Sequence, residues 1–374
     1  MYLAIREMRF AKGRYALIAT IMVLVSFLVL FVTGLAQGLA YDNAASIKNM
    51  AATHFVLEQD SNHRFTRSQV NQDQLEQSRS VVGQDNAEPL GVKMTTVSPA
   101  DDTKKIDVTL FMVNPEGWLA PTVTEGVPIA EQKDGQVVVD QKLSESGVTI
   151  GTVLVDQASG MEWTVGGFVQ NESFSHSPVV FLNEQEWLAL QGSSRTTPDT
   201  AGNNASSYNA IAIKDAGEKV DSLSAALPNA EVITKSEAVS AIPGYKEEQG
   251  SLLMMIAFLF VISAFVLAVF FYVITIQKTS QFGILKAIGT RNAYLAGSVS
   301  LQVLLLSVGS LVISVLLVRL FESILPASMP FQLGLSTLAL TCILFVIMSM
   351  AGSLFSVWKV TKIDALDAIG RTAA

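Results

Sequence analysis

The residue types that could bind a metal ion or a polar ligand gather where a polar segment runs into an apolar one. Residues 242–260 begin with a Pro-Gly turn, continue through Glu247 and Glu248, and then become apolar with Met254 and Met255 near the start. Glu248 and Met255 are seven residues apart, so on a helix they share a face at an axial separation of about 10 Å. One helix therefore cannot bring both side chains to one metal ion. In a two-fold dimer, however, the two copies of Glu248, or the two copies of a methionine, could bind one metal ion from opposite sides.

The same residues allow a simpler interpretation. Charged residues commonly flank membrane spans, and methionine packs well in irregular apolar gaps. In this interpretation the glutamates mark a membrane boundary and the methionines pack inside the span. Tyr41 and Tyr245 lie at the outer ends of the same two apolar runs, where phenols either bind a ligand or form an interfacial aromatic belt.

A second feature lies in the first apolar run. Gly34 and Gly38 are four residues apart, so on a helix they form one small-residue face. Such a face lets a neighbouring helix or a flat ligand approach closely, and ordinary helix packing explains it equally well.

The apolar runs determine which elements must position these residues. The chain has 374 residues, of which 50% are hydrophobic and 16% charged, which is too apolar for an ordinary soluble protein. Four segments exceed the roughly 20 residues that cross about 30 Å of hydrocarbon. They are residues 15–41, 249–277, 292–319 and 332–358. We expect four transmembrane helices in a one-plus-three arrangement, with residues 320–331 as a loop that contains Pro326 and Pro330.

The distribution of charge predicts the orientation. Residues 42–248 contain 29 Asp and Glu against 14 Lys and Arg, a net charge of −15, and the rest of the chain carries +7. Basic residues concentrate in the short segments 1–14, 278–291 and 359–374. By the positive-inside rule these segments are cytoplasmic. We therefore expect a plasma-membrane protein with both termini inside, a basic amphipathic surface helix at 1–14, and residues 42–248 outside.

The large acidic segment has the pattern of an α/β domain. From about residue 92 onward, short apolar runs are bounded by Gly, Asp and Asn, which predicts strands. Residues 208–235 read as strand, helix, strand, and residues 43–60 read as a helix. The predicted fold class is an α-helical membrane protein with four transmembrane helices plus an α/β extracytoplasmic domain between the first and second.

Motifs for enzyme chemistry are absent from the sequence. His54, His63 and His176 are scattered and form no H-x-x-x-H pattern, so we expect no catalytic residues and no protein metal site. The chain has no G-x-S-x-G and no Gly-Lys dipeptide, hence no Walker A loop. The only cysteine, Cys342, lies in the fourth apolar run and is expected to pack as a small hydrophobe. We expect no nucleic-acid partner.

The one-plus-three arrangement is similar to that of the MacB/FtsX-like, or type VII, ABC-transporter permeases over essentially the whole chain. The segment between the second and third spans resembles the cytoplasmic loop of that family. It contains Gln277, Lys278, Gln281, Phe282, Gly283, Ile284, Leu285, Lys286, Ala287, Ile288 and Gly289. The C-terminal "VWKVTKIDALDAIG" resembles the family ending, except that Asp364 and Ala365 stand near the usual proline. "GRYALI", "VTGLAQGLA", "AIPGYKEEQGSL" and "FFYVITIQK" look most like the DevC/HrtB branch.

The resemblance implies a homodimeric permease subunit that works with two copies of a separate ABC ATPase. Phe282, Leu285 and Ile288 share one side at helical spacing and would dock on that ATPase; resting on lipid headgroups is the alternative. The residues assigned to coupling are Gln281, Phe282, Gly283, Leu285, Lys286, Ile288 and Gly289. The chain itself is then no enzyme, and ATP is bound by the partner.

The DevC/HrtB branch further implies that haem is the transported substrate, with no intrinsic cofactor. Haem is flat and apolar and carries an iron and two carboxylates, so a site between spans suits it. The candidate substrate residues are Glu248, Met255, Met254, Glu247, Tyr245, Tyr41, Gly34 and Gly38. Glu248 or Met255 would bind the haem iron. A permease of the same fold could instead export a peptide, lipid or glycolipid, or could regulate an extracellular partner without transporting anything, as FtsX does.

Overall fold

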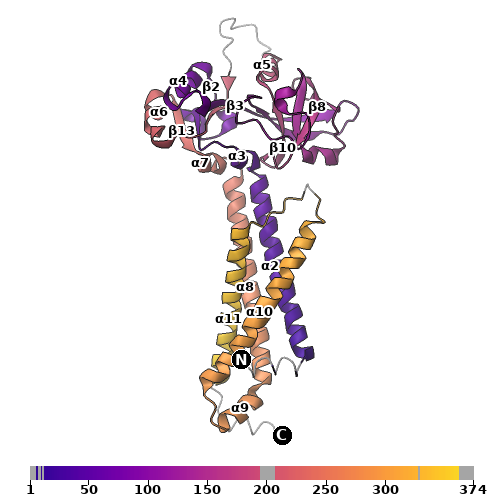
Figure 1. Ribbon diagram of the computed structural model, residues 1–374, viewed down its shortest axis with the longest axis vertical. Helices are drawn as coiled ribbons and strands as arrows, with labels where there is room; N and C mark the ends of the chain where they lie inside the picture. The colour runs from indigo at the N-terminus through magenta and orange to yellow at the C-terminus, as the bar shows by residue number, and fades with distance from the viewer. Residues whose placement is uncertain (1–5, 7–9, 11, 194–206, 327–328, 362–374) are drawn as a thin grey trace. The chain divides into compact units, whose positions relative to one another are not determined.

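The computed structural model describes residues 6, 10, 12–193, 207–326 and 329–361. The chain divides into two compact units, which are considered separately below (Figure 1). The helical unit falls within Met1–Gly38, Gly250–Pro326 and Phe331–Ala374, and the sheet unit consists of Leu39–Gln249 with Ala327–Pro330. Most of the predicted surface helix at 1–14, and residues 362–374 of the predicted tail, lie outside the described residues.

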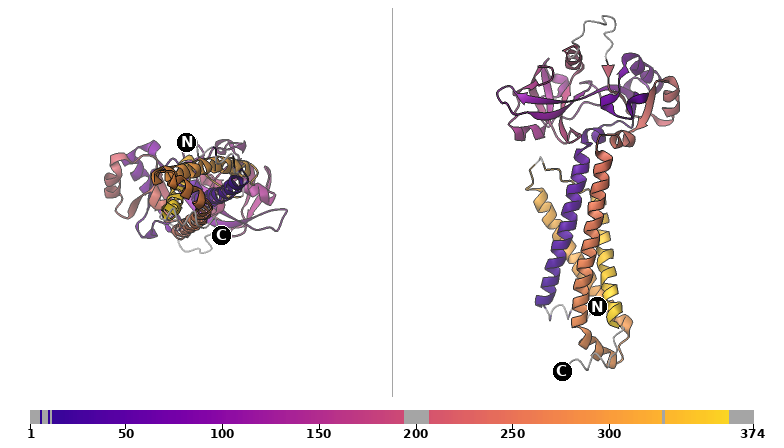
Figure 2. Two further views of the ribbon diagram at one scale, coloured as in Figure 1. Left: turned by 90° about the horizontal axis from the view of Figure 1, so that it is seen from below. Right: turned by 180° about the vertical axis from the view of Figure 1, so that it is seen from behind.

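Four long helices and one short one build the helical unit (Figures 1 and 2). They are α2 (Lys12–Asp42), α8 (Tyr245–Gln277), α9 (Thr279–Ala287), α10 (Asn292–Glu322) and α11 (Leu335–Thr361). Among the described residues, α2, α8, α10 and α11 are long and apolar enough to cross a membrane. The four predicted spans are therefore confirmed, and α8 begins four residues earlier than the apolar run because Tyr245–Glu248 already form its first turn.

The helices of this unit pack through apolar side chains and a few hydrogen-bonded hydroxyls. Met22, Leu30, Leu267 and Phe345 are buried in one cluster. Ser26 and Ser314 are hydrogen-bonded to each other at 2.7 Å across α2 and α10. A hydroxyl in hydrocarbon needs such a partner because no water is available.

The sheet unit is built on an 11-stranded mixed sheet with the main strand order β13-β1-β12-β3-β4-β10-β6-β8-β5. β7 pairs with β3 and β8, and β9 pairs with β10, while β2 and β11 form a separate pair. The strands are β1 (His54–Glu58), β2 (Val70–Asn71), β3 (Ala87–Pro99), β4 (Ile106–Met112), β5 (Glu125–Gly126), β6 (Gln136–Asp140), β7 (Val153–Asp156), β8 (Glu162–Val169), β9 (Ser173–Phe174), β10 (Ser177–Leu182), β11 (Ser207–Tyr208), β12 (Ala210–Ile213) and β13 (Ala230–Thr234).

Apolar cores cover both faces of this sheet because its central strands alternate. On β1, Phe55 and Leu57 enter one core and Val56 enters the other. The covering helices are α3 (Ala45–Asn49), α4 (Gln72–Val82), α5 (Glu184–Ser193), α6 (Val220–Ala226) and α7 (Lys235–Ser240). β12 and β13 flank β1 and are both antiparallel to it, so the predicted strand-helix-strand unit is present with β1 inserted between its strands.

The predicted helix at 43–60 is wrong beyond its first turn. Within 43–60 the five-residue helix α3 is followed by the strand β1, and only the last two residues belong to the short helix η1 (Gln59–Ser61). Phe55, Val56 and Leu57 are fully buried, and β1 pairs with a strand on each side. Tertiary pairing therefore overrides the local helical pattern.

Candidate functional site

The Glu248 carboxylate is the centre of a partly buried polar cluster in the sheet unit. Asn43 Nδ2 donates to Glu248 Oε2, and His176 Nε2 lies 2.9 Å from the same oxygen. Among the described residues, the other oxygen, Oε1, is buried and has no hydrogen-bond partner. One oxygen is thus held in place, while the second is buried without a hydrogen-bond partner. We call Asp42, Asn43, Lys142, His176 and Glu248 the Glu248 cluster.

A tight hairpin brings His176 to this position. Ser175 and His176 form the two-residue connection between β9 and β10, and both have positive φ, 51° and 62°. A two-residue loop with two positive φ angles is the type I′ turn, which usually contains Asn or Gly. Ser175 N–H donates to the carbonyl of Asn43 at 2.8 Å, which anchors the turn. A bulky residue held in this conformation is a common sign of a functional constraint.

Asp42 supplies the second carboxylate of the cluster. It forms an ion pair with Lys142 and accepts a hydrogen bond from Ser173 Oγ at 2.8 Å. His176 Nδ1 lies 3.5 Å from Asp42 Oδ2, so each ring nitrogen faces a carboxylate. A protonated imidazole can donate to both carboxylates at once, whereas a neutral one can donate to only one.

A second pair of carboxyl groups lies beside the cluster. Burial, with a smaller contribution from the nearby Asp140 carboxylate, raises the pKa of Glu172 to about 7. Burial also raises the pKa of Asp140, although its Oδ2 accepts a hydrogen bond from Glu172 N–H at 2.7 Å. Near neutral pH, Glu172 is therefore divided between its charged and neutral forms.

Tyr41 and Tyr245 are brought together around Lys48. The Lys48 Nζ lies 5.7 Å from the centre of the Tyr41 ring and 5.1 Å from that of Tyr245, which is within cation–π range. The Tyr41 hydroxyl donates to Asn49 Oδ1 at 2.6 Å. Both rings stack on one ammonium group, and the Tyr41 phenol is already hydrogen-bonded.

The other residues that the sequence suggested for substrate binding lie outside the Glu248 cluster. Glu247 is exposed and outside the Glu248 cluster. Met254 and Met255, in the helical unit, expose 56% and 44% of their surface on α8. Gly38 is buried on α2, and a Cβ added to Gly34 would lie 2.4 Å from the Phe331 ring. Within one copy of the chain, Phe331 therefore fills the space beside Gly34.

The helix α9 does not present the face that the sequence suggested for docking. Phe282 is buried and Leu285 is partly buried against the core of the helical unit. Ile288 lies just beyond the end of α9 and is 77% exposed, and Ile284 is 51% exposed. Phe282 and Leu285 therefore hold α9 against its own chain, because their side chains pack into the apolar core of the helical unit. The exposed side contains Gln281, Ile284 and Ile288.

The turn that ends α9 requires a glycine at position 289. Thr290 N–H donates to the Leu285 carbonyl at 3.0 Å, and Gly289 N–H donates to the Lys286 carbonyl at 2.9 Å. These two bonds form a Schellman motif, which needs a residue with positive φ after the helix. Gly289 has a φ of 95°.

Lys278, which precedes α9, is buried rather than solvated. Its Nζ donates to the Tyr15 hydroxyl at 2.8 Å and to Gln302 Oε1 at 3.0 Å. Tyr15 in turn donates to Gln302 at 2.7 Å. These three residues connect α2, α8 and α10 at the point where α9 begins.

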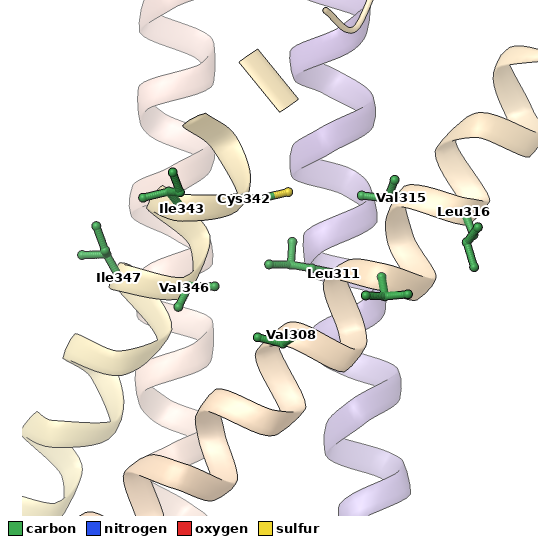
Figure 3. Close-up of a pocket in the computed structure, with 9 residues that line it drawn as sticks. Val308, Leu311, Val315, Leu316, Cys342, Ile343, Val346 and Ile347 are labelled. Carbon is green, nitrogen blue, oxygen red and sulfur yellow. The ribbon is translucent and has the colours of Figure 1, made fainter. Parts of the chain in front are cut away.

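An apolar groove of about 550 Å³ lies between α10 and α11 (Figure 3). Leu311 and Val315 of α10 face Cys342 and Val346 of α11 across it (Figure 3). Its lining has no carboxylate, amine or hydroxyl, so it suits only an apolar group such as an acyl chain.

The sequence did not point to most of the Glu248 cluster. Asn43, His176 and Lys142 follow no motif, and the Ser175-His176 turn lacks the Asn-Gly signal of its type. A weak signal for Asp42 existed, because it is the first charge after the first span.

Comparisons with known proteins agree along the whole chain. Residues 253–365 match the family model described as FtsX-like permease C-terminal. A Staphylococcus haemolyticus (strain JCSC1435) protein named as the hemin transport system permease HrtB is 30% identical over 370 residues, 99% of each chain. Its namesake from Staphylococcus epidermidis (strain ATCC 12228 / FDA PCI 1200) is 31% identical over 374 residues, again 99% of each chain.

Among solved structures, the extracellular domain of the noncanonic ABC-type transporter YknZ from Gram-positive bacteria is similar with a TM-score of 0.33. The identity is 14%, and the match covers 46% of this chain and 88% of that one. A TM-score this low supports no inference.

Proposed function

The chain belongs to the family of FtsX-like ABC-transporter permeases that includes HrtB, and from this premise we propose that it is the permease subunit of a pump that expels haem from the membrane. The observation that carries the proposal is the 30% identity, over 99% of both chains, to a protein named as a hemin transport permease. The Glu248 cluster supports it, because a carboxylate with one oxygen held and the other without a hydrogen-bond partner suits an iron ligand once the chain opens around it.

Different residues of the site would bind the iron and the propionates of haem. Glu248 Oε1 would bind the iron while Asn43 and His176 hold Oε2. The Lys48 ammonium, between Tyr41 and Tyr245, is a suitable partner for a propionate. Met254 or Met255, both exposed on α8, would supply a softer alternative ligand or an apolar wall.

A second copy of the chain would complete the site. In one copy, 11% of the membrane-spanning window of α8 is buried, the smallest fraction among the four spans. The uncovered surface of α8 leaves room for a two-fold partner that brings a second Glu248.

ATP would act through a separate ATPase, present in two copies, that contacts the exposed side of α9. Closure of the ATPase on ATP would displace α9 and with it α8. The haem site would then change between a binding and a releasing state, which is control of a two-state equilibrium by ATP.

The proposed orientation places both termini in the cytoplasm and the sheet unit outside. Single cysteines in place of Glu218 and Arg291, in a Cys342→Ala background, test it with a membrane-impermeant maleimide. In intact cells we expect labelling at position 218 only, and at position 291 only after lysis. The reverse pattern would overturn this orientation.

A haem titration of the purified full-length protein tests the substrate. We expect wild type to shift the Soret band with saturable binding, and Glu248→Gln to weaken that binding at least tenfold, since it removes a charged ligand. Glu218→Gln removes an exposed carboxylate from the same unit and serves as the matched control. Absence of a saturable Soret shift in wild type would instead favour export of a peptide, lipid or glycolipid. ATPase activity that ignores haem, with a tight extracellular protein partner, would favour an FtsX-like regulator.

A further inference from the structure

A polar cavity in the sheet unit contains none of the residues of the Glu248 cluster. Its volume is about 490 Å³, within the range of small-molecule sites. Three segments form its wall: residues 62–64, which follow the short helix η1 (Gln59–Ser61), the end of α7 with the Pro243-Gly244 turn, and the first turn of α8. Nothing in the proposed transport site uses this cavity.

Two cations in the cavity wall have no partner. Among the described residues, the side chains of Arg64 and Lys246 form no hydrogen bond or ion pair. Arg64 is half-buried and Lys246 is exposed, so a ligand can reach both. A guanidinium and an ammonium in the wall of one cavity favour an oxyanion, either a carboxylate or a phosphate ester.

The acidic residues of the wall are already engaged. Glu237 accepts hydrogen bonds from Thr234 N–H and Oγ1 at the start of α7, which lowers the pKa of this carboxyl. His63 Nε2 lies 2.8 Å from Glu231 Oε1, and Glu247 has an interaction of its own. Among the described residues, Arg64 and Lys246 are therefore the cations of the wall that no other side chain engages.

The backbone of the loop is held in an uncommon conformation. Asn62 and His63 have φ angles of 53° and 61°, both in the left-handed region. Two consecutive non-glycine residues in this region persist only where the surroundings fix them. The His63–Glu231 contact is one such restraint, and it fixes the backbone immediately before Arg64.

The sequence of α8 places this cavity near the level of lipid headgroups. Lys246 precedes Leu252, the first apolar residue of the span, by six residues, which is about 9 Å along the helix. The headgroup region on each side of a bilayer is about 5–8 Å thick. The Lys246 backbone thus lies at the outer edge of the headgroup layer, where its side chain can meet an anionic group carried by a membrane-embedded amphiphile.

We propose that the cavity bounded by Arg64 and Lys246 binds the oxyanion of a membrane-embedded amphiphile. The oxyanion is either a propionate of haem, in which case the proposal rests on the proposed transport function, or the phosphate of an anionic lipid, in which case it does not. Both sources present the same chemistry to the two cations.

The test uses full-length protein in phosphatidylcholine nanodiscs, titrated with haem and with haem dimethyl ester, whose propionates are uncharged. If the cavity takes a propionate, Arg64→Gln/Lys246→Gln should weaken haem binding about tenfold and leave ester binding unchanged. Arg64→Lys keeps the charge and should lose less. Arg67→Gln removes an exposed cation three residues away, outside the cavity, and should match wild type.

A second arm measures binding of fluorescent phosphatidylglycerol and phosphatidylcholine to the same proteins. If the cavity takes a lipid phosphate, wild type should prefer phosphatidylglycerol about tenfold, and the double variant should lose that preference. The proposal is overturned if the double variant changes neither arm, or if Arg67→Gln has the same effect. Failure of wild type to bind either form of haem would refute the transport proposal. The lipid arm would still test whether the cavity bounded by Arg64 and Lys246 binds an oxyanion.

Discussion

His176 is the residue that most directly controls the freedom of Glu248. Its two ring nitrogens face Glu248 and Asp42 at 2.9 and 3.5 Å. Replacement by alanine removes one of the two groups that hold Glu248 Oε2, the other being Asn43, so the carboxylate gains freedom that haem binding must then remove. We expect His176→Ala to weaken haem binding about tenfold, which corresponds to the loss of one hydrogen bond to a charged group. The Soret titration measures this.

A glutamine at position 176 is the informative companion variant. Its amide can still donate to Glu248, so His176→Gln should retain most of the haem affinity near neutral pH. Equal losses in the alanine and glutamine variants would show that the imidazole is needed for another reason. Unchanged binding in both would show that Glu248 does not depend on it.

Glu172 should make folding stability depend on pH. Its folded pKa is about 7, above the ordinary value of 4.5, so between these values the folded protein holds more of this proton than the unfolded chain does. This stabilising contribution is complete below pH 4.5 and is lost as the pH rises through 7. The loss is at most about 3 kcal/mol.

The expected result for Glu172→Gln is a flatter dependence of the thermal midpoint on pH, with a gain in stability at pH 8. The midpoint of the full-length protein in detergent is the measurement. Glu162→Gln removes an exposed carboxylate from β8 and should leave the wild-type dependence in place. A slope unchanged by the Glu172 substitution would rule out this residue as its source.

Residue spacing in the sequence limited the predicted iron ligands to one helix. It identified Glu248 as a candidate but could not choose between Glu248 and Glu247, which differ by about 100° around α8. Asn43 and His176 are 205 and 72 positions from Glu248 in sequence, so only the folded sheet unit brings them to its carboxylate.

At the scale of elements, α9 leads to a sharper docking prediction. Because Phe282 and Leu285 pack inside the helical unit, the surface left for an ATPase contains Ile284 and Ile288. We expect Ile284→Asp with Ile288→Asp to abolish co-purification of the ATPase while the permease still folds. Burying two carboxylates at an interface without partners costs several kcal/mol, which is enough to separate a micromolar complex.

Phe282→Asp provides the contrast for this experiment. It should lower expression and thermal stability, because its carboxylate would be placed in the core of the helical unit. ATPase that still co-purifies with the Ile284/Ile288 double variant would show that the partner binds elsewhere on the chain.

The long helices were predictable and the β1 region was not, for a physical reason. A span of more than 20 residues without charge has one stable state in hydrocarbon, namely a helix. Residues 43–60 have no such constraint, and their final state depends on pairing between β1 and two strands more than 150 residues away.

At the scale of the whole molecule, the order of elements was predictable but the sheet was not. The one-plus-three arrangement follows from the charge-free runs, and the α/β character of the insertion follows from alternation and turn residues. The strand order follows from neither, because β3 pairs with β4, β7 and β12, and local sequence patterns do not encode such long-range choices.

The helix α8 is the element through which a transport cycle would connect haem to ATP. It runs unbroken for 33 residues, about 50 Å, from the turn that contains Glu248 to Lys278 and α9. Ile262 lies in its middle and is 59% exposed. Proline at this position removes a backbone hydrogen bond and kinks the helix, at a cost of about 3 kcal/mol. We expect Ile262→Pro to retain haem binding and basal ATPase activity of the complex but to lose haem-stimulated ATPase activity and export, whereas Ile262→Ala should retain all four. Export that survives in a folded Ile262→Pro protein would mean that the two events are connected by another route than an intact α8.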